Sequence, residues 1–373
     1  MQQFSLSANI EEGQNKDFNY IVTPNAQEVA SGIVNGYNSG IHSFTIIGSY
    51  GTGKSCFLLA LEKDLQSKGQ HNLINPQTLS SCKKYEVLKI VGDYKDLASL
   101  MRNKLAIDGT ADNVLDELRN RYNQAKKRGS FLIIFIDEFG KVLEHAAKND
   151  PEQELYFMQK LAEFVNVPTR QILLVTTLHQ NFSAYARKLS SVQKEEWNKV
   201  KGRFKELVFI EPVEQLLYLA SKQNGLCKDL GENASGLNKL CQLAKNTKFV
   251  SDGLSYETTE ALYPLEPFSA YAITQAIQRY GQNERSLFSF LNTKGANSLC
   301  EYEDGFYGLA NCYDYILHNF YSYLKDANAD SMQWSSMQVA LERVEGQSWE
   351  TKNELLGAIK IVKTIGLLNL LGN

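Results

Sequence analysis

The sequence has little of what marks the more specialised classes of protein. Its 373 residues include only 7 prolines, and the longest apolar run, residues 131–136, is six residues long. A membrane-spanning helix needs about 20 apolar residues, so we expect no membrane segment. The first residues lack the charged and apolar stretches of a secretory signal, and we therefore expect a cytoplasmic protein.

Cysteine and histidine form no recognisable ligand pattern. The six cysteines include no C-x-x-C pair, and the five histidines show no H-E-x-x-H spacing. These absences argue against a disulfide framework and against a zinc site. A G-x-S-x-G nucleophile motif is also absent, which argues against a serine hydrolase.

The chain also lacks a large excess of either positive or negative charge. The chain has 39 basic and 42 acidic residues, for a net charge of -3. This balance argues against nonspecific binding of polyanions by the chain as a whole, although a local basic face for nucleic acid remains an alternative. With 43% hydrophobic residues the chain is an ordinary globular protein, and its length suggests two or three domains.

Residues 41–213 alternate short β-rich runs with helical stretches. The runs are residues 43–47, 85–91, 131–136, 171–177 and 207–210. Such alternation is typical of an α/β domain with helices on both faces of a parallel sheet. We predict an αβα three-layer core with a mainly parallel five-stranded sheet, preceded by an N-terminal segment, residues 1–40.

After Pro212 the strand-like runs stop and the remainder is predicted to be helical. We divide it into residues 214–295 and a C-terminal helical region, residues 296–373. The last predicted helix, residues 352–370, is strongly apolar. A helix of that kind normally buries its apolar surface against another part of a protein. We therefore expect the native protein to continue beyond Asn373.

A phosphate-binding loop is the most specific motif. It follows the first β-rich run, precedes a helix and matches G-x-x-x-x-G-K-[ST]. Its residues, with the one that follows, are Gly48, Ser49, Tyr50, Gly51, Thr52, Gly53, Lys54, Ser55 and Cys56. The glycines let backbone N–H groups point at a phosphate, Lys54 adds a positive charge, and the Ser55 hydroxyl is a ligand for Mg²⁺. The alternative is a glycine turn followed by a chance Lys-Ser pair.

Two carboxylates end the most apolar run. Asp137 and Glu138 follow Phe131–Ile136, and pleat alternation directs their side chains differently. Asp137 is the candidate Mg²⁺ ligand, and Glu138 is the candidate group that polarises an attacking water. The alternative is that the pair caps a helix.

From about Ile41 to Leu291 the chain resembles the AAA+ and related STAND ATPases, the P-loop class with an additional strand and a catalytic glutamate. It is most similar to the origin-recognition-like modules of large bacterial defence or DNA-processing proteins. The resemblance implies ATP and Mg²⁺ as cofactors, and the absence of an N-K-x-D tetrapeptide agrees with ATP over GTP. It also implies a γ-phosphate sensor at the end of the fourth strand. Thr177 is the first candidate and His179 the second, unless these residues simply end the strand.

The same resemblance identifies two arginines and a lid. Arg203, just before the fifth strand, occupies the position of an arginine finger that reaches a neighbouring subunit; its alternative is a surface arginine on a solvated helix face. Residues 214–295 resemble the helical lid, where Arg285 is the candidate second sensor or a structural ion-pair partner. The end of the chain resembles the start of a winged-helix segment.

These expectations favour an Mg²⁺-dependent ATPase that drives conformational change or oligomer assembly, in bacterial defence or DNA processing. The alternative is a nucleotide-gated switch or scaffold whose slow hydrolysis controls a separate effector. A DNA-loading ATPase is a third possibility. The expected partners are further copies of the chain or an effector protein.

Overall fold

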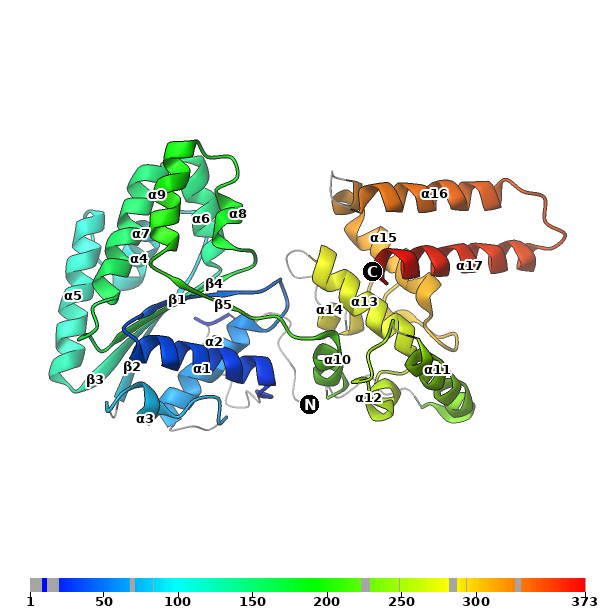
Figure 1. Cartoon of the computed structure of the whole chain (residues 1–373), viewed down its shortest axis with the longest axis horizontal. Helices are drawn as coiled ribbons and strands as arrows, with labels where there is room; N and C mark the ends of the chain where they lie inside the picture. Colours follow the sequence, from blue (N-terminus) through cyan, green and yellow to red (C-terminus); the bar gives the residue numbers. More distant parts are fainter. Residues whose placement is uncertain are drawn as a thin grey trace. The chain divides into compact units, whose positions relative to one another are not determined.

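The computed structural model describes residues 9–11, 20–67, 71–82, 84–222, 229–247, 249–281, 287–292, 294–325 and 330–372. They form two compact units, one ending at Ile210 and the other beginning at Glu211 (Figure 1). The first unit contains the sheet, and the second is built of helices.

The first unit is organised around a five-stranded sheet in which every pairing is parallel. The strands are β1 (Ser43–Ile47), β2 (Lys84–Val91), β3 (Ser130–Asp137), β4 (Ile172–Leu178) and β5 (Lys205–Val208). Their order across the sheet is β2-β3-β4-β1-β5. The predicted α/β class with a parallel five-stranded sheet is thereby confirmed.

Helices cover both faces of this sheet (Figure 1). On one face lie α1 (Pro24–Asn38), α2 (Lys54–Ser67) and α3 (Pro76–Leu79), and on the other lie α4 (Leu97–Leu105), α5 (Ala111–Lys127), α6 (Phe139–Lys148), α7 (Pro151–Val165), α8 (Phe182–Tyr185) and α9 (Ser191–Lys201). Strand β3 is apolar throughout because both of its faces are buried. Phe131 and Ile133 belong to one apolar cluster, and Leu132 and Ile134 belong to the other.

The structure adds detail to two regions and shifts one predicted strand. Residues 1–40 contain α1, which begins after the capping Thr23 and buries Val29 and Ile33 against the sheet. The region before β3 holds two helices, because Ala106 and Gly109 interrupt it with φ values of 53° and 113°. Strand β5 begins two residues earlier than predicted, at Lys205, because an edge strand tolerates charged side chains.

The second unit is helical in its described part. Its elements are α10 (Val213–Ser221), η1 (Gly231–Asn233), α11 (Ala234–Asn246), α12 (Tyr256–Ala261), α13 (Pro267–Tyr280), α14 (Leu287–Asn292), η2 (Leu299–Glu301), α15 (Leu309–Lys325), α16 (Ser331–Glu345) and α17 (Lys352–Leu371). Most of these helices contribute to one buried apolar cluster, which runs from Val213 to Leu371 along the chain and includes Tyr313. The division at residue 295 therefore stays a prediction.

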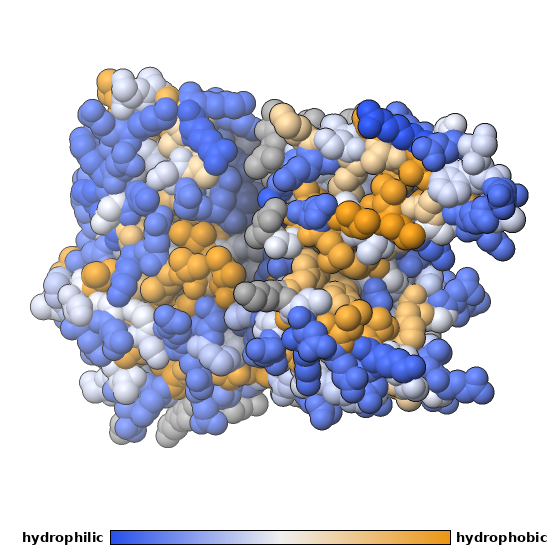
Figure 2. Space-filling view, turned by 45° about the vertical axis from the view of Figure 1, so that its right-hand side comes forward, coloured by the Kyte–Doolittle hydropathy of each residue, from blue (hydrophilic) through white to orange (hydrophobic). Residues whose placement is uncertain are grey.

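Apolar residues also reach the surface of this unit (Figure 2). On α17 the side chains of Leu356, Ile361 and Ile365 are exposed. Across the described residues, every helix is too short or too polar to span a membrane.

Candidate active site

The strand order brings three predicted motifs to one edge of the sheet. Strand β4 lies between β1 and β3, and all three are parallel. Their carboxyl ends therefore meet at the same edge. The phosphate loop leaves β1 there, Asp137 is the last residue of β3, and Thr177 is the penultimate residue of β4.

The glycines of the loop are required by its backbone. Gly51 and Gly53 have φ values of 73° and 94°, a region that residues with a side chain rarely adopt. Gly48 is required for a steric reason, because a Cβ atom there would lie 2.1 Å from the carbonyl oxygen of Phe209. The loop therefore has the curled backbone that the motif predicts.

Lys54 is half-buried at the first turn of α2 and hydrogen-bonds to the loop itself. Its Nζ donates to the carbonyl oxygens of Gly48 and Ser49, at 2.5 and 2.8 Å. Burial lowers the pKa of Lys54 to about 8, and the nearby charges of Asp137 and Glu138 oppose this change. With a pKa this close to neutral pH, the protonation of Lys54 will change if another group replaces these two carbonyl oxygens as its partner.

The two residues that follow Lys54 also belong to the first turn of α2. Ser55, the candidate Mg²⁺ ligand, is half-buried. Burial, with the charge of Asp137, raises the pKa of the Cys56 thiol to about 11.

Asp137 and Glu138 are joined through Thr177. Asp137 is buried, and its Oδ1 accepts hydrogen bonds from Thr177 Oγ1 at 2.5 Å and from the backbone N–H of Glu138 at 3.0 Å. Thr177 Oγ1 also lies 3.0 Å from that N–H and accepts from it. The predicted sensor residue therefore holds the acidic pair in place.

Glu138 has a left-handed backbone, with φ of 53° and ψ of 34°. It stands at the N-cap position of α6, but its side chain makes no capping hydrogen bond. Its Oε2 instead pairs with Lys141 Nζ at 2.5 Å. Glu138 therefore occupies the N-cap position without capping the helix through its side chain. Its carboxylate is half-exposed at the edge of the sheet.

Two close contacts near the acidic pair were not found from the sequence. Gly92, which follows β2, donates its N–H to the carbonyl of Asp137 at 2.7 Å. A Cβ atom at Gly92 would lie 2.3 Å from the carbonyl oxygen of Glu138. The ion pair with Lys141 could have been found, because residues three apart on a helix face each other.

His179, the second sensor candidate, lies beside the phosphate loop. Its ring stacks on Tyr50, with the ring centroids 4.6 Å apart and the planes at 23°. Burial and the charge of Lys54 lower the pKa of His179 to about 4. The imidazole is therefore neutral near pH 7.

Arg203 lies at the opposite edge of the sheet. Its carbonyl accepts from the hydroxyl of Ser43, the first residue of β1, at 2.6 Å, whereas the phosphate loop follows the last residue. Its guanidinium pairs with Glu163 at 2.6 Å and donates to the carbonyl of Lys199 at 2.8 Å. Arg203 is therefore remote from the loop of its own chain. Arg285 falls outside the described residues.

The acidic pair and Ser55 fit an Mg²⁺ site of the phosphate-loop type. Among the described residues, Asp137 Oδ2 has no hydrogen-bond partner, so this oxygen is available to a cation or its water. No group of three or more His, Cys, Asp or Glu side chains gathers in the described part of the chain. Mg²⁺ commonly uses one or two protein ligands together with phosphates and water, and this donor set suits it.

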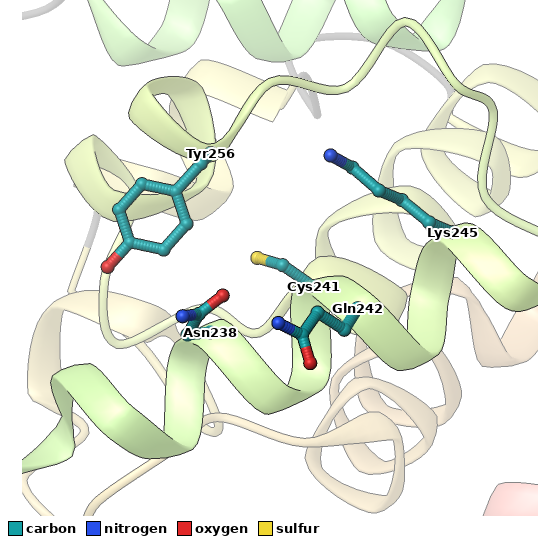
Figure 3. Close-up of a pocket in the computed structure, with 5 residues that line it drawn as sticks. All are labelled: Asn238, Cys241, Gln242, Lys245 and Tyr256. Atoms are coloured by element: carbon teal, nitrogen blue, oxygen red, sulfur yellow. The ribbon is translucent and has the colours of Figure 1, made fainter.

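A shallow pocket in the helical unit is separate from these residues. It has a volume of about 230 Å³ and is lined by Asn238, Cys241, Gln242, Lys245 and Tyr256 from α11 and α12 (Figure 3). Burial raises the pKa of the Cys241 thiol, which makes it a weak nucleophile. The pocket brings together no catalytic constellation.

No family model and no curated protein matches the chain. Similar solved structures include the ORC2 protein of Aeropyrum pernix in complexes with ADPNP and ADP, at 14% identity over 92% of this chain and 82% of that chain, with a TM-score of 0.39. Drosophila ORC bound to DNA is 12% identical over 98% and 82% of the two chains, with a TM-score of 0.37. C. elegans PCH-2 is 14% identical over 82% and 71%, with a TM-score of 0.36. Similarity of this degree carries no argument about activity or partners.

Proposed function

We propose that this protein binds and hydrolyses ATP with Mg²⁺. The observation that carries the proposal is the meeting of three strand ends, which places the phosphate loop, the Asp137–Glu138 pair and Thr177 at one edge of the sheet. A glycine turn with a chance Lys-Ser pair would not require a buried aspartate and a polar strand end beside it.

Each residue has a distinct role in this proposal. The N–H groups of the loop and the first turn of α2 bind phosphate, and Lys54 exchanges its bonds to Gly48 and Ser49 for phosphate oxygens. Ser55 and Asp137 hold Mg²⁺, which when bound neutralises phosphate charge. Glu138 accepts a proton from the attacking water, while Thr177 holds Asp137 and the backbone of Glu138 in place.

Arg203 serves a neighbouring chain in this proposal. Because its backbone contacts the amino end of β1, it cannot reach the phosphate loop of its own chain. An arginine that stabilises charge on a transferring phosphoryl group then has to act in trans. The proposal therefore includes a homo-oligomer in which Arg203 leaves Glu163 for the site of the adjacent subunit.

A nucleotide-gated switch or scaffold is the second candidate. It is favoured by the ion pair between Glu138 and Lys141, because a carboxylate held at 2.5 Å from an ammonium group is a poor proton acceptor until it is released. In that case ATP binding orders an oligomer and a separate effector supplies the output. A setting in bacterial defence or DNA processing is part of the proposal in either case.

Steady-state ATP hydrolysis against protein concentration tests the proposal. Wild type, Glu138→Gln and Arg203→Ala are compared, with light scattering in the same buffers containing ATP and Mg²⁺. We expect wild-type specific activity to rise with concentration, and both variants to bind nucleotide without turnover. If wild type binds ATP without turnover at any concentration, hydrolysis fails as the function and the switch replaces it.

A further inference from the structure

Three aromatic rings connect the phosphate loop to α8. Tyr50 stacks on His179, and Tyr185 of α8 packs edge-on against the same imidazole, at a centroid distance of 5.5 Å and an angle of 82°. The Tyr185 hydroxyl lies 3.0 Å from Nδ1 of His179, within hydrogen-bond distance. We call Tyr50, His179 and Tyr185 the aromatic column.

The column also touches the helix that carries Glu138. Gly140 lies in the first turn of α6, two residues after Glu138. A Cβ atom at Gly140 would lie 2.3 Å from the Tyr185 hydroxyl and 3.1 Å from Nδ1 of His179. The backbone of α6 therefore rests directly on the column, and any larger residue would push the two apart.

All three rings are uncharged near neutral pH. Burial lowers the pKa of His179 to about 4, with the charge of Lys54 as the second cause. Burial raises the pKa of Tyr50 to about 12 and that of Tyr185 further still. The column consequently provides packing contacts near Lys54 and Glu138 without adding charge to the site.

We infer that His179 and Tyr185 are positioning residues that set the place of Glu138 relative to the phosphate loop. This inference rests on the proposed function, in which Glu138 must face a phosphate held by the loop. The phosphate cradle itself depends on the backbone of Gly51 and Gly53, which neither His179 nor Tyr185 contributes. Loss of the His179 or Tyr185 contacts should therefore lower kcat and leave nucleotide affinity nearly unchanged.

Four variants separate the contacts. His179→Ala removes the stack and the hydrogen bond, His179→Phe keeps a ring against Tyr50, and Tyr185→Phe removes only a hydroxyl. Tyr156→Phe removes a hydroxyl from an exposed tyrosine and is the matched control. The loss of one half-buried stack and one hydrogen bond should lower kcat about tenfold or more in His179→Ala, with the Kd for ADP within about threefold of wild type.

Amide hydrogen exchange supplies a readout that does not depend on turnover. We expect His179→Ala to exchange faster in two separate segments, residues 48–56 and 138–146, with the rest of the unit unchanged. His179→Phe should restore protection in residues 48–56 alone. Tyr185→Phe should affect residues 138–146, and Tyr156→Phe neither segment.

The inference is overturned if only one segment responds to His179→Ala, or if exchange rises throughout the unit, since the ring would then be merely structural. If wild type does not hydrolyse ATP, the exchange pattern still decides whether the column exists as a unit. Failure of the proposed function and failure of the inference are thus seen in different measurements.

Discussion

The hydroxyl of Thr177 donates to Oδ1 of Asp137 at 2.5 Å and accepts from the backbone N–H of Glu138 at 3.0 Å. One side chain on β4 therefore fixes the carboxylate of one acidic residue and the backbone of the next. This relationship gives Thr177 a role that a residue merely ending a strand would not have.

Removal of the Thr177 hydroxyl should reduce turnover. Thr177→Ala loses hydrogen bonds to a buried carboxylate and to an amide, which costs about 1–3 kcal/mol of stability and lowers kcat by about 10- to 100-fold. Thr177→Ser keeps the hydroxyl and should remain within about threefold of wild type. Steady-state kinetics and urea unfolding of both variants check this prediction, and wild-type kcat in Thr177→Ala would contradict it.

Nucleotide binding should take up a proton above pH 8. Burial lowers the pKa of Lys54 to about 8 in the free protein, so its charge is lost as the pH rises through that value. Phosphate oxygens favour the charged form, so binding restores the proton and the affinity for ADP falls with rising pH. Calorimetry at pH 8.5 in two buffers of different ionisation enthalpy measures the uptake. Lys54→Gln is the control and should show none.

A methyl group at Gly92 should disturb the acidic pair. The new Cβ would lie 2.3 Å from the carbonyl oxygen of Glu138, so the ends of β2 and β3 must separate. Gly92→Ala should lower both the Tm and kcat. Gly357→Ala is the control, since no described neighbour lies within 4 Å of the added Cβ and alanine favours a helix by up to about 1 kcal/mol. A normal Tm and kcat in Gly92→Ala would show that the contact is easily relieved.

Cys56, in the first turn of α2, should react slowly with thiol reagents. Burial, with the charge of Asp137, raises the pKa of Cys56 to about 11, so little thiolate exists at pH 7.5. N-ethylmaleimide should modify the exposed Cys300 before Cys56 and leave ADP binding intact. Mass spectrometry of peptides sampled over time gives the order of labelling. Labelling of Cys56 ahead of Cys300 would contradict the raised pKa of the Cys56 thiol.

The sequence predicts β3 and the phosphate loop well because both depend on local rules. Strand β3 is buried on both faces and so reads as an unbroken apolar run, and the loop needs glycine where φ is positive. Contacts between distant segments leave no such pattern. Nothing near Tyr185 indicates that its hydroxyl meets His179, and nothing near Gly92 indicates the backbone of Glu138.

The strand order also decides when this site can form during synthesis. Among the described strands, β1 pairs with β4 and β5 alone, and both follow it far along the chain. A nascent chain that has left the ribosome as far as β3 can pair β2 with β3, while β1 still has no neighbour. The phosphate loop is thus translated early, but its flanking apolar strand β1 has a partner in the sheet only after β4 has been made.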